Sequence, residues 1–178
     1  MYRKEECHMK PALVKRPGFE TPQAAPSRIQ RILVAVDFSE DSCHALTYAA
    51  GLAAEFDASL TLVHVVEPHF GPGVANSTAS TKGEPEGAEF AEAKLELNDL
   101  GARMLGPCRV VETVVRGGLA FFEITEAAQA LGADLIVLGT HGSNGLQRAL
   151  LGSTAEKVVR HAPCPVLVAR PTNARTIL

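Results

Sequence analysis

The chain has 178 residues, of which 46% are hydrophobic and 21% are charged, a composition typical of one soluble globular domain. No apolar run approaches the roughly 20 residues that span a bilayer, so no membrane-spanning helix is predicted. Aromatic residues make up only 5% of the chain and tryptophan is absent, which argues against an aromatic stacking surface for single-stranded nucleic acid.

The first 30 residues differ from the rest of the chain in charge and in pattern. They hold six Lys or Arg residues against three Glu, a net charge of +3, whereas residues 31–178 hold 11 basic and 17 acidic residues, a net charge of −6. They are rich in proline and lack sustained periodicity, so residues 1–30 are expected to form a flexible basic extension. The acidic remainder lacks the clustered Lys and Arg of a DNA-binding face, and no nucleic-acid partner is expected.

The spacing of the cysteines argues against a disulfide-stabilised protein and against a zinc-binding one. They lie far apart, without a CxxC pair, so neither a disulfide framework nor a zinc site is predicted. The N-terminus has no apolar stretch of signal-peptide length. A cytoplasmic protein with reduced thiols is therefore expected, and the four cysteines concerned are Cys7, Cys43, Cys108 and Cys164.

Strand-like and helix-like patterns alternate along the rest of the chain. Continuous apolar runs are typical of strands covered on both faces, and apolar residues three and four apart are typical of helices that pack by one side. A stretch of Gly, Pro, Ser and Thr is expected to form a flexible loop over 68–87. In chain order the patterns predict strand 32–36, helix 40–56, strand 60–66, helix 90–105, strand 109–115, helix 121–131, strand 135–138, helix 153–161 and strand 166–169.

This alternation predicts an α/β fold with an open five-stranded parallel sheet and helices on both faces. The strands over 32–36 and 135–138 are the most apolar and are expected to be central, whereas the alternating strand over 109–115 is expected at an edge. With right-handed crossovers, the order 3-2-1-4-5 satisfies both conditions. Ligands of such sheets bind beyond the carboxyl ends of the strands at the switch point, here next to Asp37 and Gly139.

The most informative motif follows the strand over 135–138. It is the run GTHGSNG over 139–145, followed by Gly152 and Ser153. Glycines let backbone N–H groups approach a ligand, and a helix N-terminus attracts anions. Ser153 is the expected N-cap of the last helix. The spacing is neither a Walker A motif nor GxGxxG, so the motif indicates either a different phosphate cradle or a plain turn.

As G-x2-G-x9-G-S, this motif resembles the nucleotide-binding signature of the universal stress protein family. The runs ILVAVDFSEDS, LTLVHVVE, ADLIVLGTHG and LLGSTAEKVVRHAPCPVLVAR are also similar to that family. The resemblance covers most of a domain over 31–171, which leaves 172–178 as a C-terminal tail. It implies an adenine nucleotide alpha hydrolase-like fold and a frequent homodimer. Because every position of the signature is present, it implies the ATP-binding class of the family.

Residue by residue, the resemblance implies a set of contacts with ATP, expected together with magnesium. Asp37, the backbone of Ala35 and Val65 are expected beside the adenosine part, and Leu138 and Gly139 beside the ribose and first phosphates. Backbone N–H groups and hydroxyls are expected to hold the polyphosphate at Gly142, Gly152, Ser153 and Thr154. No residue is assigned as a metal ligand.

Several of these side chains have a structural alternative. Asp37 sits where a helix-capping carboxylate is common, and His141 either approaches the nucleotide or makes only a structural hydrogen bond. His64 is expected to be a satisfied core histidine. Gly117 and Gly118 stand where many relatives carry Gly-Asp, so the next helix is expected to be capped differently. Ser143 and Asn144, in the loop between the signature residues, are weaker candidates for phosphate contact, and structural or solvated roles are expected for His161, Cys164 and Arg148.

The function expected from these features is that of an ATP-binding, cytoplasmic module in stress response or signalling. The homodimer is expected to form through Val166–Ala169, because this strand edge would otherwise be exposed. A protein partner is expected but not identified. Neither a carboxylate pair nor a Ser/His/Asp set is apparent, so nothing marks an efficient hydrolase. The alternatives are a slow ATPase or autophosphorylating enzyme, with Ser153 or Ser143 as acceptor, and an interaction module without nucleotide.

Overall fold

The computed structural model describes residues 28–67, 87–105, 111–140 and 151–170. Most of the expected extension, loop and tail thus lies outside the described residues. Strands and helices alternate in the predicted order, and none of the described helices is long and apolar enough to cross a membrane. The elements are β1 (Arg31–Ala35), α1 (Glu40–Phe56), β2 (Ser59–Val66), α2 (Ala88–Leu105), β3 (Val111–Gly117), α3 (Ala120–Leu131), β4 (Leu135–Gly139), α4 (Ser153–His161) and β5 (Val166–Ala169).

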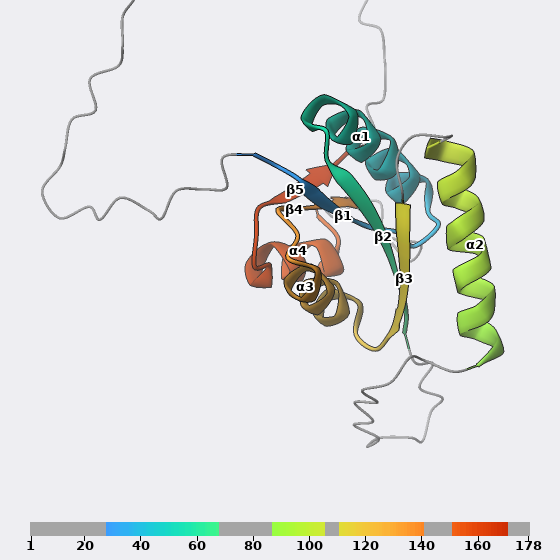
Figure 1. Ribbon diagram of the computed structural model, residues 1–178. Helices are drawn as coiled ribbons and strands as arrows, with labels where there is room; N and C mark the ends of the chain where they lie inside the picture. Colours follow the sequence, from blue (N-terminus) through green and yellow to red (C-terminus); the bar gives the residue numbers. More distant parts are fainter. Residues whose placement is uncertain (1–27, 68–86, 106–110, 141–150, 171–178) are drawn as a thin grey trace, which may run out of the picture.

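The five strands form one parallel sheet in the order β3-β2-β1-β4-β5. This is the predicted order, and the two most apolar strands, β1 and β4, lie side by side at its centre. Helices α1 and α2 cover one face of the sheet, and α3 and α4 cover the other (Figure 1). The crossovers from β1 and β4 therefore leave toward opposite faces, as the predicted switch point requires.

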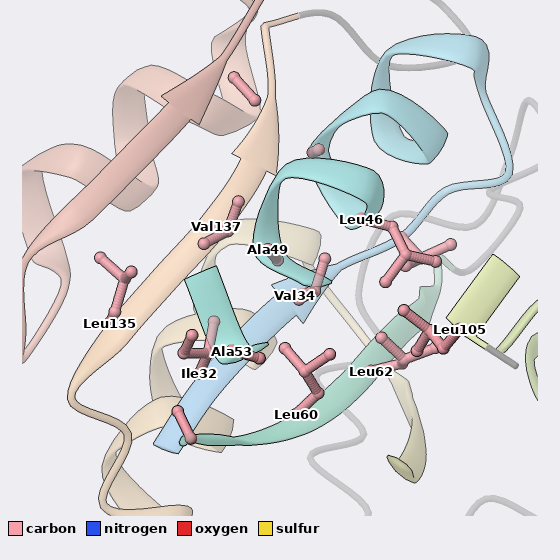
Figure 2. Packing of buried hydrophobic residues seen from close by; sticks show 14 of the residues in the cluster. Ile32, Val34, Leu46, Ala49, Ala53, Leu60, Leu62, Leu105, Leu135 and Val137 are labelled. Carbon is pink, nitrogen blue, oxygen red and sulfur yellow. The ribbon is translucent and has the colours of Figure 1, made fainter. Parts of the chain in front are cut away.

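The face under α1 and α2 holds the larger part of the core (Figure 2). Alternate residues of the central strands, such as Val34 and Leu62, point to this face and are fully buried. Helix α1 meets them with the alanines Ala45, Ala49 and Ala53, whose small side chains bring the helix axis close to the sheet. The low aromatic content of the chain follows from this close packing of helix on strand.

The opposite face is filled by the other residues of the same strands. Leu33 and Ile136 point toward α3 and α4, where Ala127 and Val158 meet them. Side chains from successive positions of β1 and β4 are thus buried on both faces. This explains why these two strands read as continuous apolar runs and not as alternating ones.

Strand β3 corrects one predicted boundary. The sequence pattern predicts a strand over 109–115, of which 109 and 110 lie outside the described residues, and the strand over Val111–Gly117 ends two residues later than predicted. Its end is set by pairing with β2, whose last residue Val66 is in register with Gly117. Side-chain alternation alone does not carry this register, because the pattern is the same for strands shifted by two residues.

Strand β3 is an edge strand, as predicted, and helix α2 makes polar contacts with it at Thr113. The ammonium of Lys94 donates to the main-chain carbonyl of Thr113. The Thr113 hydroxyl donates to the side-chain carbonyl of Asn98 over 2.6 Å. The Lys94 contact occupies one main-chain acceptor of this edge strand, which would otherwise be available to another strand.

The start of α3 bears out the expectation of an unusual cap. The N-cap residue Leu119 provides no side-chain hydrogen bond. Instead, the carboxylate of Glu67, just beyond β2, accepts from the backbone N–H of Ala120 over 3.0 Å. Gly118 before it has φ +143°, where an added Cβ would also lie only 3.0 Å from Glu123. A carboxylate from the neighbouring strand thus takes the place of a local Asp.

Candidate functional site

Two helices begin at the carboxyl ends of the neighbouring strands β1 and β4. Helix α1 starts after β1 on one face of the sheet, and α4 starts after the segment that follows β4 on the other face (Figure 1). Asp37, Thr140 and Gly152 therefore converge at the predicted switch point. The two helix starts differ in one respect that matters for anion binding.

The start of α1 is closed by its own side chains. The N-cap residue Ser39 accepts from the backbone N–H of Ser42 over 3.2 Å. Asp37 Oδ1 in turn accepts from the Ser39 N–H over 3.1 Å and from its hydroxyl over 2.5 Å. Asp37 thus organises the turn into α1, and the expected capping role is taken by Ser39 with Asp37 behind it.

The residue between them has an uncommon backbone. Phe38 has φ +61°, which is rare for a bulky residue. Its ring centroid lies 4.6 Å from that of His64, and His64 Nδ1 is 2.8 Å from the carbonyl oxygen of Val36. Because a carbonyl only accepts, Nδ1 carries the hydrogen. His64 has the hydrogen-bond partner that was expected, but it is half-buried and not part of the core, and it packs against Phe38 in the turn that carries Asp37.

The start of α4 corrects the predicted cap. The N-cap is Gly152, and Ser153 is the first helical residue. The reason is that the Gly152 N–H donates to the Thr140 carbonyl over 2.7 Å, which turns the chain into the helix one residue earlier. Within the described residues, no side chain caps α4. The N–H groups of Ser153, Thr154 and Ala155 have no acceptor inside the helix.

The end of β4 packs closely against the first turn of α1. A Cβ added to Gly139 would lie 2.9 Å from the main-chain carbonyl carbon of Asp41. The next residue, Thr140, is buried, with 4% of its surface exposed, and its hydroxyl donates to Asp41 Oδ2 over 2.8 Å. The sequence patterns assign neither Thr140 nor Asp41 to the site. The available signal is a hydroxyl residue that directly follows a buried strand and its terminal glycine.

Three of the expected contact residues share one face of the sheet. Ala35, Val65 and Leu138 all point toward α3 and α4 at the carboxyl ends of three neighbouring strands. Leu138 is buried, while Ala35 and Val65 are half-buried. The fold therefore brings these residues to the side of the sheet on which α4 begins. Gly142, His141, Ser143, Asn144 and Arg148 lie outside the described residues.

His161 and Cys164 lie in surroundings that fit the structural roles expected for them. His161 Nδ1 lies 2.8 Å from the Lys157 carbonyl in the last turn of α4. Burial raises the pKa of the Cys164 thiol, and the negative charge of Asp134 raises it further. This thiol is therefore protonated at neutral pH, which suits packing and not reactivity. Among the described residues, no group of three or more His, Cys, Asp or Glu side chains could hold a metal ion.

Comparison with known proteins gives a consistent result. The model of the universal stress protein family matches residues 28–170. A universal stress protein of Methanocaldococcus jannaschii is 36% identical over 146 residues, which cover 79% of this chain and 82% of the relative. A putative universal stress protein of Staphylococcus epidermidis is 34% identical over 143 residues, with 79% of this chain and 84% of the relative covered.

Solved structures of the same family share the fold. The universal stress protein UspA of Lactobacillus plantarum superimposes with a TM-score of 0.61 at 31% identity, over 82% of this chain and 100% of that one. The Archaeoglobus fulgidus universal stress protein in complex with dAMP gives a TM-score of 0.54 at 27% identity, over 78% and 96% of the two chains. The sheet order, the switch-point residues and these matches together show that the chain belongs to the universal stress protein family.

Proposed function

We propose that the chain is a nucleotide-dependent module that binds ATP beyond the carboxyl ends of β1 and β4. The observation that carries the proposal is the contrast between the two helix starts at this point. At α1 the Ser39 hydroxyl, held by Asp37, already accepts from the Ser42 N–H, whereas α4 presents its first backbone N–H groups without a side-chain cap among the described residues. An open helix start combines aligned N–H donors with the positive end of the helix dipole, which favours phosphate.

The adenosine part is assigned to the strand ends on the same face. Ala35 and Val65 are half-buried and apolar there, as a surface for an adenine ring requires. Asp37, in the turn between β1 and α1, is proposed to contact the adenosine part from the end of β1. The related protein of Archaeoglobus fulgidus, whose structure contains dAMP, supports an adenine nucleotide as the ligand class. Binding, and not turnover, is the proposed role.

Magnesium is proposed to enter with the nucleotide. Residues 31–178 carry a net charge of −6, and Asp37, Glu40 and Asp41 place carboxylates around the start of α1. These charges repel free ATP at long range. Since the described residues hold no three-ligand metal cluster, the ion would be bound by phosphate oxygens, which is a common arrangement for Mg²⁺. The magnesium complex of ATP is therefore the ligand to test.

ATP is expected to stabilise the protein against unfolding. At a nucleotide concentration of 100 times Kd, the free energy of unfolding should rise by about 2.7 kcal/mol, measured by urea denaturation with and without Mg-ATP. Ser153→Pro removes one open N–H at a helix position that tolerates proline, and it should weaken ATP binding about tenfold. Ser153→Ala is the matched control, because it removes the hydroxyl and keeps the N–H.

Adenosine separates the two parts of the site. Ser153→Pro should leave adenosine binding unchanged, since adenosine has no phosphate. Asp37→Ala should weaken both ligands. If Mg-ATP causes no stabilisation of the unaltered chain, or if Ser153→Pro binds ATP as tightly as Ser153→Ala does, the proposed phosphate position is wrong.

The two edges of the sheet support a homodimer through β5. At the β3 edge, Lys94 donates to the Thr113 carbonyl and Asn98 accepts from the Thr113 hydroxyl. Along β5, no side chain of the described ranges makes a comparable hydrogen bond to the strand, and β5 itself carries no charge. Uncharged, uncovered edges tend to pair with another strand. Pairing of β5 with β5 of a second copy about a two-fold axis would cover both edges at once.

The dimer is tested by placing charge on this edge. Leu167 is half-buried in β5 and packs against the core cluster under α1 and α2. Leu167→Lys in both copies would bring like charges close together across the two-fold axis, and the circular dichroism spectrum of the variant must match that of the parent to show that its fold is kept. We expect sedimentation velocity to show a dimer for the unaltered chain and a monomer for the variant. Leu95→Lys is the control, because Leu95 lies on α2, outside β5, and is 71% exposed. A monomeric parent, or a variant that still dimerises, would exclude this interface.

A further inference from the structure

A chain of hydrogen bonds crosses the switch point from α1 to α4. The hydroxyl of Thr140 donates to Asp41 Oδ2 over 2.8 Å, and the Thr140 carbonyl accepts from the Gly152 N–H over 2.7 Å. The Gly152 carbonyl then accepts from the N–H of Glu156 over 2.9 Å, which closes the first turn of α4. One residue, Thr140, therefore joins the starts of two helices that lie on opposite faces of the sheet.

The hydrogen bond from Thr140 to Asp41 is a strong one, because it is buried and its acceptor is charged. Thr140 is 4% exposed, so its hydroxyl needs a partner inside the protein. A carboxylate as acceptor makes the hydrogen bond stronger than one between neutral groups. Gly139 is what allows this contact, because its missing Cβ lets the first turn of α1 approach the end of β4.

We infer that Asp41 is a positioning residue, which acts through Thr140 on Gly152 and so fixes the first turn of α4. Asp41 lies in the first turn of α1, and its carboxylate reaches the end of β4 through the Thr140 hydroxyl, so its contribution to α4 is made through Thr140. The effect on nucleotide affinity rests on the proposed function. The effect on the order of α4 does not, and it is tested separately.

Amide hydrogen exchange in the nucleotide-free protein tests the positioning role directly. Thr140→Val keeps the shape of the side chain and removes its hydroxyl, and Asp41→Ala removes the acceptor. In both variants, exchange at the N–H groups of Gly152 and Glu156 should be faster by about tenfold to a hundredfold, because a hydrogen bond to a charged group is lost. Thr140→Ser keeps a hydroxyl and should exchange at close to the parental rate.

Two comparisons separate this role from a general loss of stability. Thr125 is also a buried threonine, whose hydroxyl donates to the Phe122 carbonyl within α3. Thr125→Val should speed exchange in α3 and leave Gly152 unchanged. The double variant Asp41→Ala with Thr140→Val should exchange no faster at Gly152 than either single variant, because both remove the same contact. Unchanged exchange at Gly152 in Thr140→Val, or full additivity, would overturn the inference.

The affinity for Mg-ATP, measured by titration calorimetry, provides the second readout. Kd should rise about tenfold in Thr140→Val and in Asp41→Ala. In the separate variant Thr140→Ser, which keeps a hydroxyl, Kd should stay near the parental value. If the unaltered chain binds no Mg-ATP, the proposed function is wrong, and the exchange rates alone decide whether Asp41 positions α4. If exchange changes as expected but Kd does not, the first turn of α4 is not where phosphate binds.

Discussion

Replacement of Gly139 by alanine is expected to lower the free energy of unfolding by about 1–3 kcal/mol. The added Cβ would lie 2.9 Å from the carbonyl carbon and 3.0 Å from the carbonyl oxygen of Asp41. Both are main-chain atoms of a helix, so they cannot rotate away as a side chain would. Relief requires that the first turn of α1 move away from β4. Urea denaturation at constant pH measures the loss.

Gly51→Ala is the matched control for this substitution. Gly51 is an exposed residue within α1, and a Cβ added there would meet nothing within 4 Å. Alanine should therefore stabilise the helix by about 0.5–1 kcal/mol. The two glycine-to-alanine changes thus have opposite expected signs. If Gly139→Ala were neutral or stabilising, α1 would not approach the end of β4 as closely as described.

Leu62→Ala is expected to cost about 2–5 kcal/mol of unfolding free energy. Leu62 lies in β2 within the cluster under α1 and α2 (Figure 2), and its exposed fraction is 0%. Its truncation removes apolar contacts and leaves a cavity between the sheet and two helices. The same urea titration measures the change, which should appear as a lower midpoint with an unchanged slope.

Leu95→Ala provides the comparison for this core substitution. Leu95 lies on α2 and is 71% exposed, so its truncation opens no cavity. The expected change is within about 0.5 kcal/mol. Equal losses for the two leucines would mean that the described packing of α2 and β2 is wrong.

The sheet was largely predictable because its signal is local. β1 and β4 are buried on both faces, so apolar residues are needed at successive positions, and the sequence shows this as a continuous apolar run. Once these strands are placed centrally, right-handed crossovers fix the strand order. The boundary of β3 was not predictable in the same way. Its end depends on pairing with Val66 of another strand, and that register is a tertiary property.

The candidate site was predictable in position and less so in detail. A glycine-rich segment after a buried strand located the switch point, and Asp37 lies there as expected. The shift of the α4 cap from Ser153 to Gly152 was missed, because it depends on a hydrogen bond to Thr140. The contact of Thr140 with Asp41 joins residues 99 positions apart in the chain. Neither residue belongs to a spacing pattern, so only the folded structure brings them together.

The two edges of the sheet differ in their surroundings. Within the described residues, Lys94 of α2 occupies the main-chain carbonyl of Thr113 at the β3 edge, and Asn98 accepts from the Thr113 side chain. If the proposed dimer forms through β5, a single pairing uses that edge in both copies, and any further growth would have to use β3. The Lys94 contact removes one hydrogen-bond acceptor from the β3 edge, which works against its pairing with another strand.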